Sequence, residues 1–332
     1  MNKMMKKNIL LWSVVAMVLW CACSDKEDRL EPSYADRDWM EIRDEPGELN
    51  QLRYKLYKEY EIPTFVNDTI GSEQRGYDAY GQPIIYHEML WPGYTLTGRV
   101  SGLCHLSSDT VGMVKMLQMM YDWVAPNLLK DIKSRPASYL LCDIVDSKEK
   151  GLYSNDTVYT KYDIQVGLKT TALSICNVKE MGQDELKDFA ARIVGYATYV
   201  DLISYYEEEL NEFYEISKEG LEKTPYNQKI KYSPPVPEYP DGWKEEKLYL
   251  TGGFLYDDFR SYKWDVGSSA ESRTVSSSTP AQAIDVRDYV GAVMVYSESE
   301  FEQLYGKYDK MMRKFRFMKE KVAFYKTEVL KE

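Results

Sequence analysis

The chain has 332 residues, with 42 lysines and arginines against 53 aspartates and glutamates, giving a net charge of −11. So acidic a surface argues against nucleic-acid binding and against electrostatic adhesion to anionic lipid headgroups. The length suffices for one large domain or two modest ones, each with a proper hydrophobic core.

Residues 1–22 have the layout of a signal peptide. Lysines precede an apolar run, Ile9 to Trp20, that is shorter than the ~20 apolar residues a membrane span needs. The segment Leu19-Trp-Cys-Ala-Cys23 resembles the lipobox of bacterial lipoproteins, and the charged stretch 24–28 resembles the export tag of Bacteroidota surface lipoproteins. This resemblance implies cleavage before Cys23, lipidation of Cys23, and a lipid anchor in the outer membrane with the protein exposed at the cell surface. The alternative is an ordinary secreted protein with an incidental cysteine.

The mature chain is expected to hold a tether followed by one folded body. Residues 23–46 are polar and lack aliphatic periodicity, which predicts a lipid-anchored tether. Apolar residues then recur at helical spacing from Leu49 to Tyr60. We therefore expect the body to occupy residues 47–332 as a single domain.

Further elements follow in chain order. The strand candidates are 64–66, a hairpin or irregular β region in 71–107, 138–145 and 171–176. The helix candidates are one from a cap at Asp109 to about Val124, a long one from Gln183 to about Lys218 that is broken near residues 207–209, and helices from Pro280 to the end. The last helix carries an apolar face that is expected to pack on the body, with membrane-surface binding as the alternative. Between these helices, residues 223–280 predict a long aromatic loop region.

The residues that most often carry catalysis are scarce. Two histidines, His87 and His105, are too few for a typical zinc site, and no phosphate loop or nucleophile motif is present. Cys104, Cys142 and Cys176 lack metal-type spacing. Cys142 and Cys176 lie in apolar runs, which favours buried thiols, and whether any pair forms a disulfide stays open. We expect no cofactor and no bound metal.

Aromatic residues make up 14% of the chain and include 29 tyrosines. Such rings stack on sugars and fill binding interfaces, although they also cover core edges and pin loops. The densest aromatic set in the loop region is Tyr239, Trp243, Tyr256, Tyr262 and Trp264, and the candidate binding residues are Tyr239, Trp243, Tyr256 and Trp264.

The order of segments resembles the zinc-binding, zincin-like metallopeptidase lipoproteins found beside Sus-like uptake systems of Bacteroidota. The similarity covers roughly residues 48–330. It is carried by Leu49–Tyr57 with Glu61–Pro63, Met113–Ile132 leading into Ser138–Ser147, Asn211-Glu-Phe-Tyr-Glu-Ile-Ser217, Gly252–Tyr256, Asp288–Tyr296 and Ser299–Phe301. The resemblance implies an α+β, zincin-like fold in which a small mixed sheet packs with several long helices and a C-terminal helical region.

The decisive motif is absent. The resemblance places His-Glu-x-x-His on Ala197-Thr198-Tyr-Val-Asp201, and a further ligand near Ser204. Ala197 cannot bind metal, Thr198 is no general base, and only Asp201 offers an oxygen. We therefore expect no catalytic residues and a pseudoenzyme.

The resulting hypothesis is a degenerate metallopeptidase-like lipoprotein that binds a peptide, a glycan or a partner protein at a Sus-like transporter. Two alternatives stay open: an active metallopeptidase or other hydrolase with an unrecognised site, and a structural accessory subunit of an outer-membrane transporter.

Overall fold

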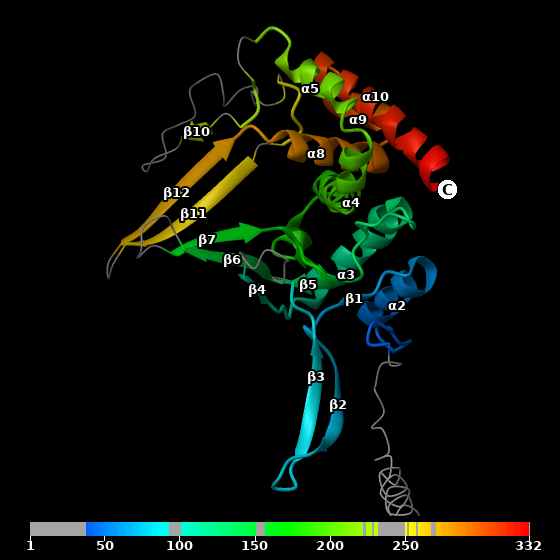
Figure 1. Ribbon diagram of the computed structural model, residues 1–332, viewed down its shortest axis with the longest axis vertical. Coiled ribbons are helices and arrows are strands. Elements are labelled where there is room, and N and C mark those ends of the chain that lie inside the picture. The colour runs from blue at the N-terminus through cyan, green and yellow to red at the C-terminus, as the bar shows by residue number, and fades with distance from the viewer. Residues whose placement is uncertain are drawn as a thin grey trace, which may run out of the picture. The chain divides into compact units, whose positions relative to one another are not determined.

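The computed structural model is mixed α and β (Figure 1). It describes residues 38–92, 101–150, 157–221, 224–227, 229–231, 250, 252–256, 258–266 and 270–331. Met40–Glu332 forms one compact unit. Ile42 is buried with Phe65 and Leu90, so folded packing begins earlier than the expected tether boundary at residue 46.

A four-stranded sheet lies at the centre of this unit. Its order is β1 (Thr64–Phe65), β5 (Tyr139–Cys142), β9 (Thr171–Ser174) and β8 (Ile164–Val166). The first three strands are parallel, and β8 runs antiparallel to β9 at the edge. All residues of β1, β5 and β9 are buried, as expected for strands covered on both faces. The strands predicted near residues 64, 138 and 171 are confirmed.

A second sheet has six strands that pair antiparallel throughout. It corrects the prediction of a long loop over 223–280, because three of its strands lie there. A serine-rich strand such as 270–278 lacks the apolar alternation by which strands are recognised, so its pairing partner defines it. In sheet order the strands are β10 (Lys229–Lys231), β12 (Ala270–Ser278), β11 (Asp258–Val266), β7 (Thr157–Tyr162), β6 (Ile144–Lys150) and β4 (Ser101–His105).

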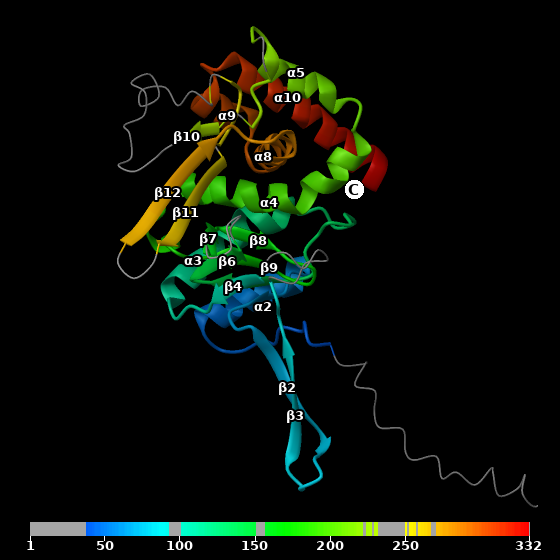
Figure 2. The same cartoon turned by 60° about the vertical axis from the view of Figure 1, so that its left-hand side comes forward.

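The third sheet is a separate hairpin, β2 (Thr69–Tyr77) with β3 (Pro83–Met89). It runs away from the other elements of the Met40–Glu332 unit in both views (Figures 1 and 2). At its tip, Asp78 Oδ1 accepts hydrogen bonds from the backbone N–H groups of Tyr80 and Gln82, both at 2.8 Å. Gly81 takes the positive φ of +77° that this turn requires. The hairpin predicted within 71–107 is confirmed.

The first helices behave as predicted, with one difference. Helix α2 (Glu48–Tyr60) ends where Glu61 adopts the left-handed conformation, two residues before Pro63. Helix α3 (Thr110–Met119) starts at Asp109, whose side chain caps Gly112 N at 3.1 Å. It continues as a π-helical turn, Met120–Val124, and not as regular α-helix.

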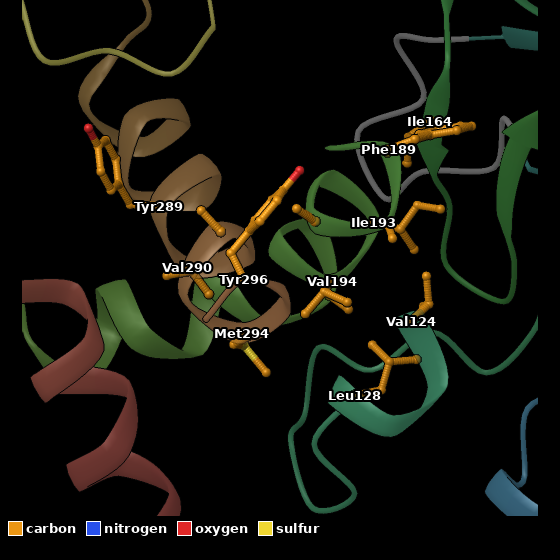
Figure 3. Packing of buried hydrophobic residues seen from close by; sticks show 14 of the residues in the cluster. Val124, Leu128, Ile164, Phe189, Ile193, Val194, Tyr289, Val290, Met294 and Tyr296 are labelled. Atoms are coloured by element: carbon orange, nitrogen blue, oxygen red, sulfur yellow. The ribbon is translucent and has the colours of Figure 1, made fainter. Parts of the chain in front are cut away.

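Helix α4 (Gln183–Tyr205) and helix α8 (Gln282–Val295) cross in close contact above the four-stranded sheet (Figure 2). A Cβ added to Gly291 would lie 1.9 Å from Ala191 O, and one added to Gly195 would lie 2.4 Å from Arg287 O. The two backbones can approach this closely only because glycine has no side chain. On its other side α4 buries Phe189, Ile193 and Val194 in the main core (Figure 3).

Helix α4 ends at Tyr205 and a new helix begins at Leu210, so the break predicted at the Glu207–Glu209 run is confirmed. The final helices pack on the body, and Phe315 at the centre of the last helix is fully buried. These elements are α5 (Leu210–Lys218), α9 (Glu298–Tyr305), α10 (Asp309–Phe324) and a π-helical end, Tyr325–Leu330.

Candidate functional site

The turn of α4 at which the resemblance places a metal motif is closed. Ala197 and Thr198 are 2% and 0% exposed. Asp201 Oδ2 accepts hydrogen bonds from Ser134 Oγ at 2.5 Å and from Ser134 N at 3.1 Å, and Ser134 Oγ also lies 2.6 Å from Ala197 O. Asp201 therefore fastens the loop before β5 to α4, and the Ala197 and Thr198 side chains have no opening to solvent.

The remaining ligand candidates are dispersed. Ser204 is exposed and donates to Val200 O at 2.9 Å. His87 is exposed on β3, where its Nδ1 lies 2.7 Å from Ser72 Oγ, and His105 ends β4 in a different sheet. Among the residues that the structure describes, no three His, Cys, Asp or Glu side chains are grouped as a metal ion requires.

The aromatic candidates do not form a described site. Tyr239 and Trp243 lie outside the described residues, and Tyr262 and Trp264 lie on β11, where the backbone alone is described. Tyr256 is half-buried and donates its hydroxyl to Asp188 Oδ1 at 3.1 Å. This contact supports a structural role for the Tyr256 ring, which was the alternative to ligand binding.

Asp188 marks a polar cluster between α4 and α8 that the sequence patterns did not reveal. Besides Tyr256, it accepts from the Tyr296 hydroxyl at 2.7 Å. Burial raises the pKa of Asp188, while these two hydrogen bonds and Arg192 oppose that rise. Each partner comes from a different element, so no local spacing signals the cluster.

Asp288 extends the cluster on α8 and is 3% exposed. Arg287 holds it through two hydrogen bonds, of 2.6 Å and 2.8 Å. Burial raises the pKa of Asp288 to about 6, while the charge of Arg287 opposes the rise. Arg192 in turn donates to Asp163 at 2.8 Å. Acid–base catalysts often use carboxylates with raised pKa values. Here, however, Asp188 and Asp288 are each hydrogen-bonded to other side chains of the protein.

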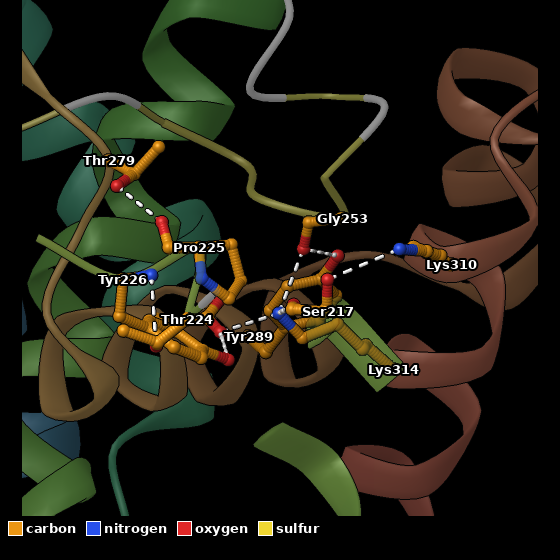
Figure 4. A network of polar contacts seen from close by, with 10 residues as sticks. Ser217, Thr224, Pro225, Tyr226, Gly253, Thr279, Tyr289, Lys310 and Lys314 are labelled. Atoms are coloured by element: carbon orange, nitrogen blue, oxygen red, sulfur yellow. Dashed lines mark hydrogen bonds and ion pairs between the residues drawn. The ribbon is translucent and has the colours of Figure 1, made fainter. Parts of the chain in front are cut away.

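A second buried polar centre surrounds Lys314, whose side chain is 0% exposed (Figure 4). Its Nζ donates to Asp285 Oδ2 at 2.5 Å, Gly253 O at 2.8 Å and Ser217 Oγ at 2.9 Å. Burial lowers the pKa of Lys314 to about 8, while Asp285 opposes the change. An ammonium group has three hydrogens to donate, and all three are used inside the protein, so this centre is a clamp between helices and not a ligand site.

Among the described residues, the two most exposed large apolar side chains, Tyr80 and Tyr77, lie on the β2–β3 hairpin. Tyr77 and Tyr80 are 68% and 90% exposed, and Ile84 and Ile85 are about half exposed. We call these four residues the hairpin patch; it covers both faces of the hairpin, because Ile84 and Ile85 are consecutive on β3 and point to opposite sides. A shallow depression of about 400 Å³ lies elsewhere, on α2, and is lined mainly by charged and amide side chains such as Lys55 and Glu59. The hairpin patch is the described surface best suited to contact another molecule.

Comparisons with known proteins give no family: no family model, no curated protein and no solved structure matches the chain. Among the described residues, no helix is both long and apolar enough to cross a membrane.

Proposed function

We propose that this chain is a lipid-anchored protein of the bacterial envelope that works by binding a polypeptide partner on a catalytically degenerate, metallopeptidase-like scaffold. The observation that carries the proposal is the closed turn of α4. A hydrolytic zinc needs three protein ligands and an open position for water, whereas Ala197 and Thr198 are packed and Asp201 is bonded to Ser134.

The fold supports a zincin-like scaffold in this proposal. Three parallel strands and the antiparallel edge strand β8 precede α4, the helix on which the resemblance places the metal motif. Helices α5, α8, α9 and α10 follow in the order that the resemblance implies. The same resemblance places the partner at a Sus-like uptake system of the outer membrane.

The hairpin supports a polypeptide as the ligand. In a two-stranded sheet, alternate backbone N–H and C=O groups of each strand point away from the partner strand and are open to a third strand. The pairing is irregular on β2, between Thr69 and Gly71 and between Gln74 and Tyr77, whereas β3 runs without a break through Ile85 to Glu88. Irregular edges resist strand addition, so β3 is the edge that would accept it.

The charge of the hairpin indicates which kind of partner strand would pair with β3. Residues 68–91 hold four carboxylates and one arginine, and that arginine, Arg75, donates to Glu73 at 2.7 Å and stacks on the Tyr86 ring at 3.4 Å. A second copy of this acidic chain would be repelled. The proposed partner therefore presents an extended segment in which basic residues alternate with apolar ones.

The binding test uses a short peptide of alternating lysine and valine, long enough to span β3, and a glutamate–valine peptide of equal length. We expect the full-length chain to bind the lysine peptide in calorimetry, more weakly at high salt, and not to bind the glutamate peptide. Changing Ile84→Thr and Ile85→Thr together keeps β propensity, removes apolar surface and should weaken binding about tenfold or more. Phe324→Ser, a change at an exposed ring on α10, is the matched control and should bind normally.

Three outcomes would overturn the ligand choice. They are equal binding by the Ile84/Ile85 variant, self-association through the hairpin patch in sedimentation, and binding of maltoheptaose without binding of the lysine peptide. The pseudoenzyme half of the proposal has a separate measurement, which is zinc analysis of the purified chain. Stoichiometric zinc that is lost in Asp201→Ala would contradict it.

A further inference from the structure

Two cysteines that lie far apart in the sequence meet where the two larger sheets join. Cys104 belongs to β4 of the six-stranded sheet, and Cys142 is the last residue of β5 in the four-stranded sheet. Cys104 packs against the buried cluster that contains Cys142, and the two thiols lie close enough to interact. Cys176, by contrast, is exposed.

The backbone holds this pair in place from both sides. His105 pairs with Ile144 in the ladder between β4 and β6, and Asp143 N donates to His105 O at 2.7 Å. Ile175 N donates to Cys142 O, also at 2.7 Å, which fixes the other flank. Both cysteines therefore sit on strands whose relative position is set by backbone hydrogen bonds, so the fold itself holds the two residues near each other.

We propose that Cys104 and Cys142 form a disulfide when the folded protein meets a thiol–disulfide oxidant, and that Cys176 remains a free thiol. Cys104 is the more accessible of the pair, so its thiolate attacks the small disulfide, forms a mixed disulfide and releases one thiol. Cys142 then loses its proton, and its sulfur attacks Cys104 Sγ and expels the second thiol. Two protein thiols are oxidised, one small disulfide is reduced, and both protons end on the released thiols.

The bond would close a loop over residues 105–141, which includes α3 and its π-helical turn, and would tie the two sheets together at β4 and β5. Closing a loop of this length constrains the unfolded chain and so stabilises the folded one. The expectation that this disulfide forms in the cell rests on the proposed function, because export would bring the chain into an oxidising compartment.

The test begins with the purified full-length chain. After incubation with oxidised glutathione and alkylation of the remaining thiols, we expect peptide mapping to show Cys104 joined to Cys142 and Cys176 alkylated. Cys176→Ser should give the same linkage, whereas Cys104→Ser should leave Cys142 unlinked to any protein cysteine. The oxidised chain should unfold at a higher urea concentration than the reduced chain, and Cys104→Ser should lose this difference.

Alkylation of both Cys104 and Cys142 after oxidation would overturn the inference, as would a linkage from either of them to Cys176. A second arm traps thiols directly in the bacterium that makes the protein. Linkage in the purified chain with free thiols in the bacterium would uphold the pairing and contradict the proposed export. Failure of the pairing is thus distinguished from failure of the proposed function.

Discussion

The surroundings of Lys314 in the structure differ sharply from those that its neighbours in the sequence suggest. In the sequence it belongs to a basic stretch on the last helix, where a lysine ordinarily faces water. In the structure it is enclosed by the rings of Phe213, Phe254 and Tyr289, each within 5 Å of its Nζ, and it forms an ion pair with Asp285. The protein thereby carries a fully buried charge pair between α10 and α8.

We predict that Lys314→Met destabilises the chain by about 3–5 kcal/mol, because it leaves the Asp285 carboxylate buried without its cation. Combining Lys314→Met with Asp285→Leu should recover much of that loss, since no uncompensated charge then remains. Urea unfolding gives both values. Lys319→Met is the control, because Lys319 forms an exposed ion pair with Glu298 and its removal should cost no more than about 1 kcal/mol. A Lys314 variant as stable as the Lys319 variant would disprove the clamp.

At the scale of elements, the crossing of α4 and α8 organises the upper part of the body. Leu186, Phe189 and Ile193 give α4 an apolar face, and this spacing alone predicted a core helix. The second covered face, which carries Ala191 and Gly195, has no such signature, because alanine and glycine have too little apolar surface to mark a helix face as buried. The role of these residues emerges only when Gly291 of α8 is found against them.

Gly291→Ala should therefore force the two helices apart. The added Cβ would meet the backbone oxygen of Ala191, which cannot rotate away, so we expect a loss of about 1–3 kcal/mol or more in unfolding free energy. Hydrogen exchange should show faster opening of α8. Gly182→Ala, at the start of α4, meets only Glu185 at 3.7 Å and should cost at most about 1 kcal/mol. Equal stability of the two variants would mean that the close approach of α4 and α8 at Gly291 contributes nothing to the free energy of unfolding.

For the whole molecule, the acidic charge and the N-terminal segment are the basis of the proposed location and the proposed partner. With a net charge of −11 the chain is not expected to hold itself on anionic lipid, so the proposed membrane attachment would require acyl chains at Cys23. In the proposed function, the hairpin patch would supply the surface for a partner.

Cys23→Ala is expected to abolish lipidation and to move the protein out of the detergent-rich phase in Triton X-114 partition. Cys21→Ala is the matched control, since it changes a neighbouring cysteine that would be cleaved away, and it should partition like the unchanged chain. Partition of both variants into the detergent phase would contradict lipidation at Cys23.

Local patterns alone determined a good part of this protein. Helical spacing located α2, the break between α4 and α5, and the helices after Pro280, because amphipathic periodicity and charge runs are properties of a single segment. The same patterns misjudged 258–278, whose strands are defined by pairing with β7, and Cys176, which lies in an apolar run yet is exposed.

Only the tertiary structure decided which residues meet. The Lys314–Asp285 pair, the bonding of Asp188 by Tyr256 and Tyr296, and the contact of Cys104 with Cys142 each join segments from separate elements. The sequence could show that Ala197 cannot bind metal, because that follows from its chemistry. It could not show that this turn is closed, because closure depends on a loop residue, Ser134, that is remote in the chain and adjacent only after folding.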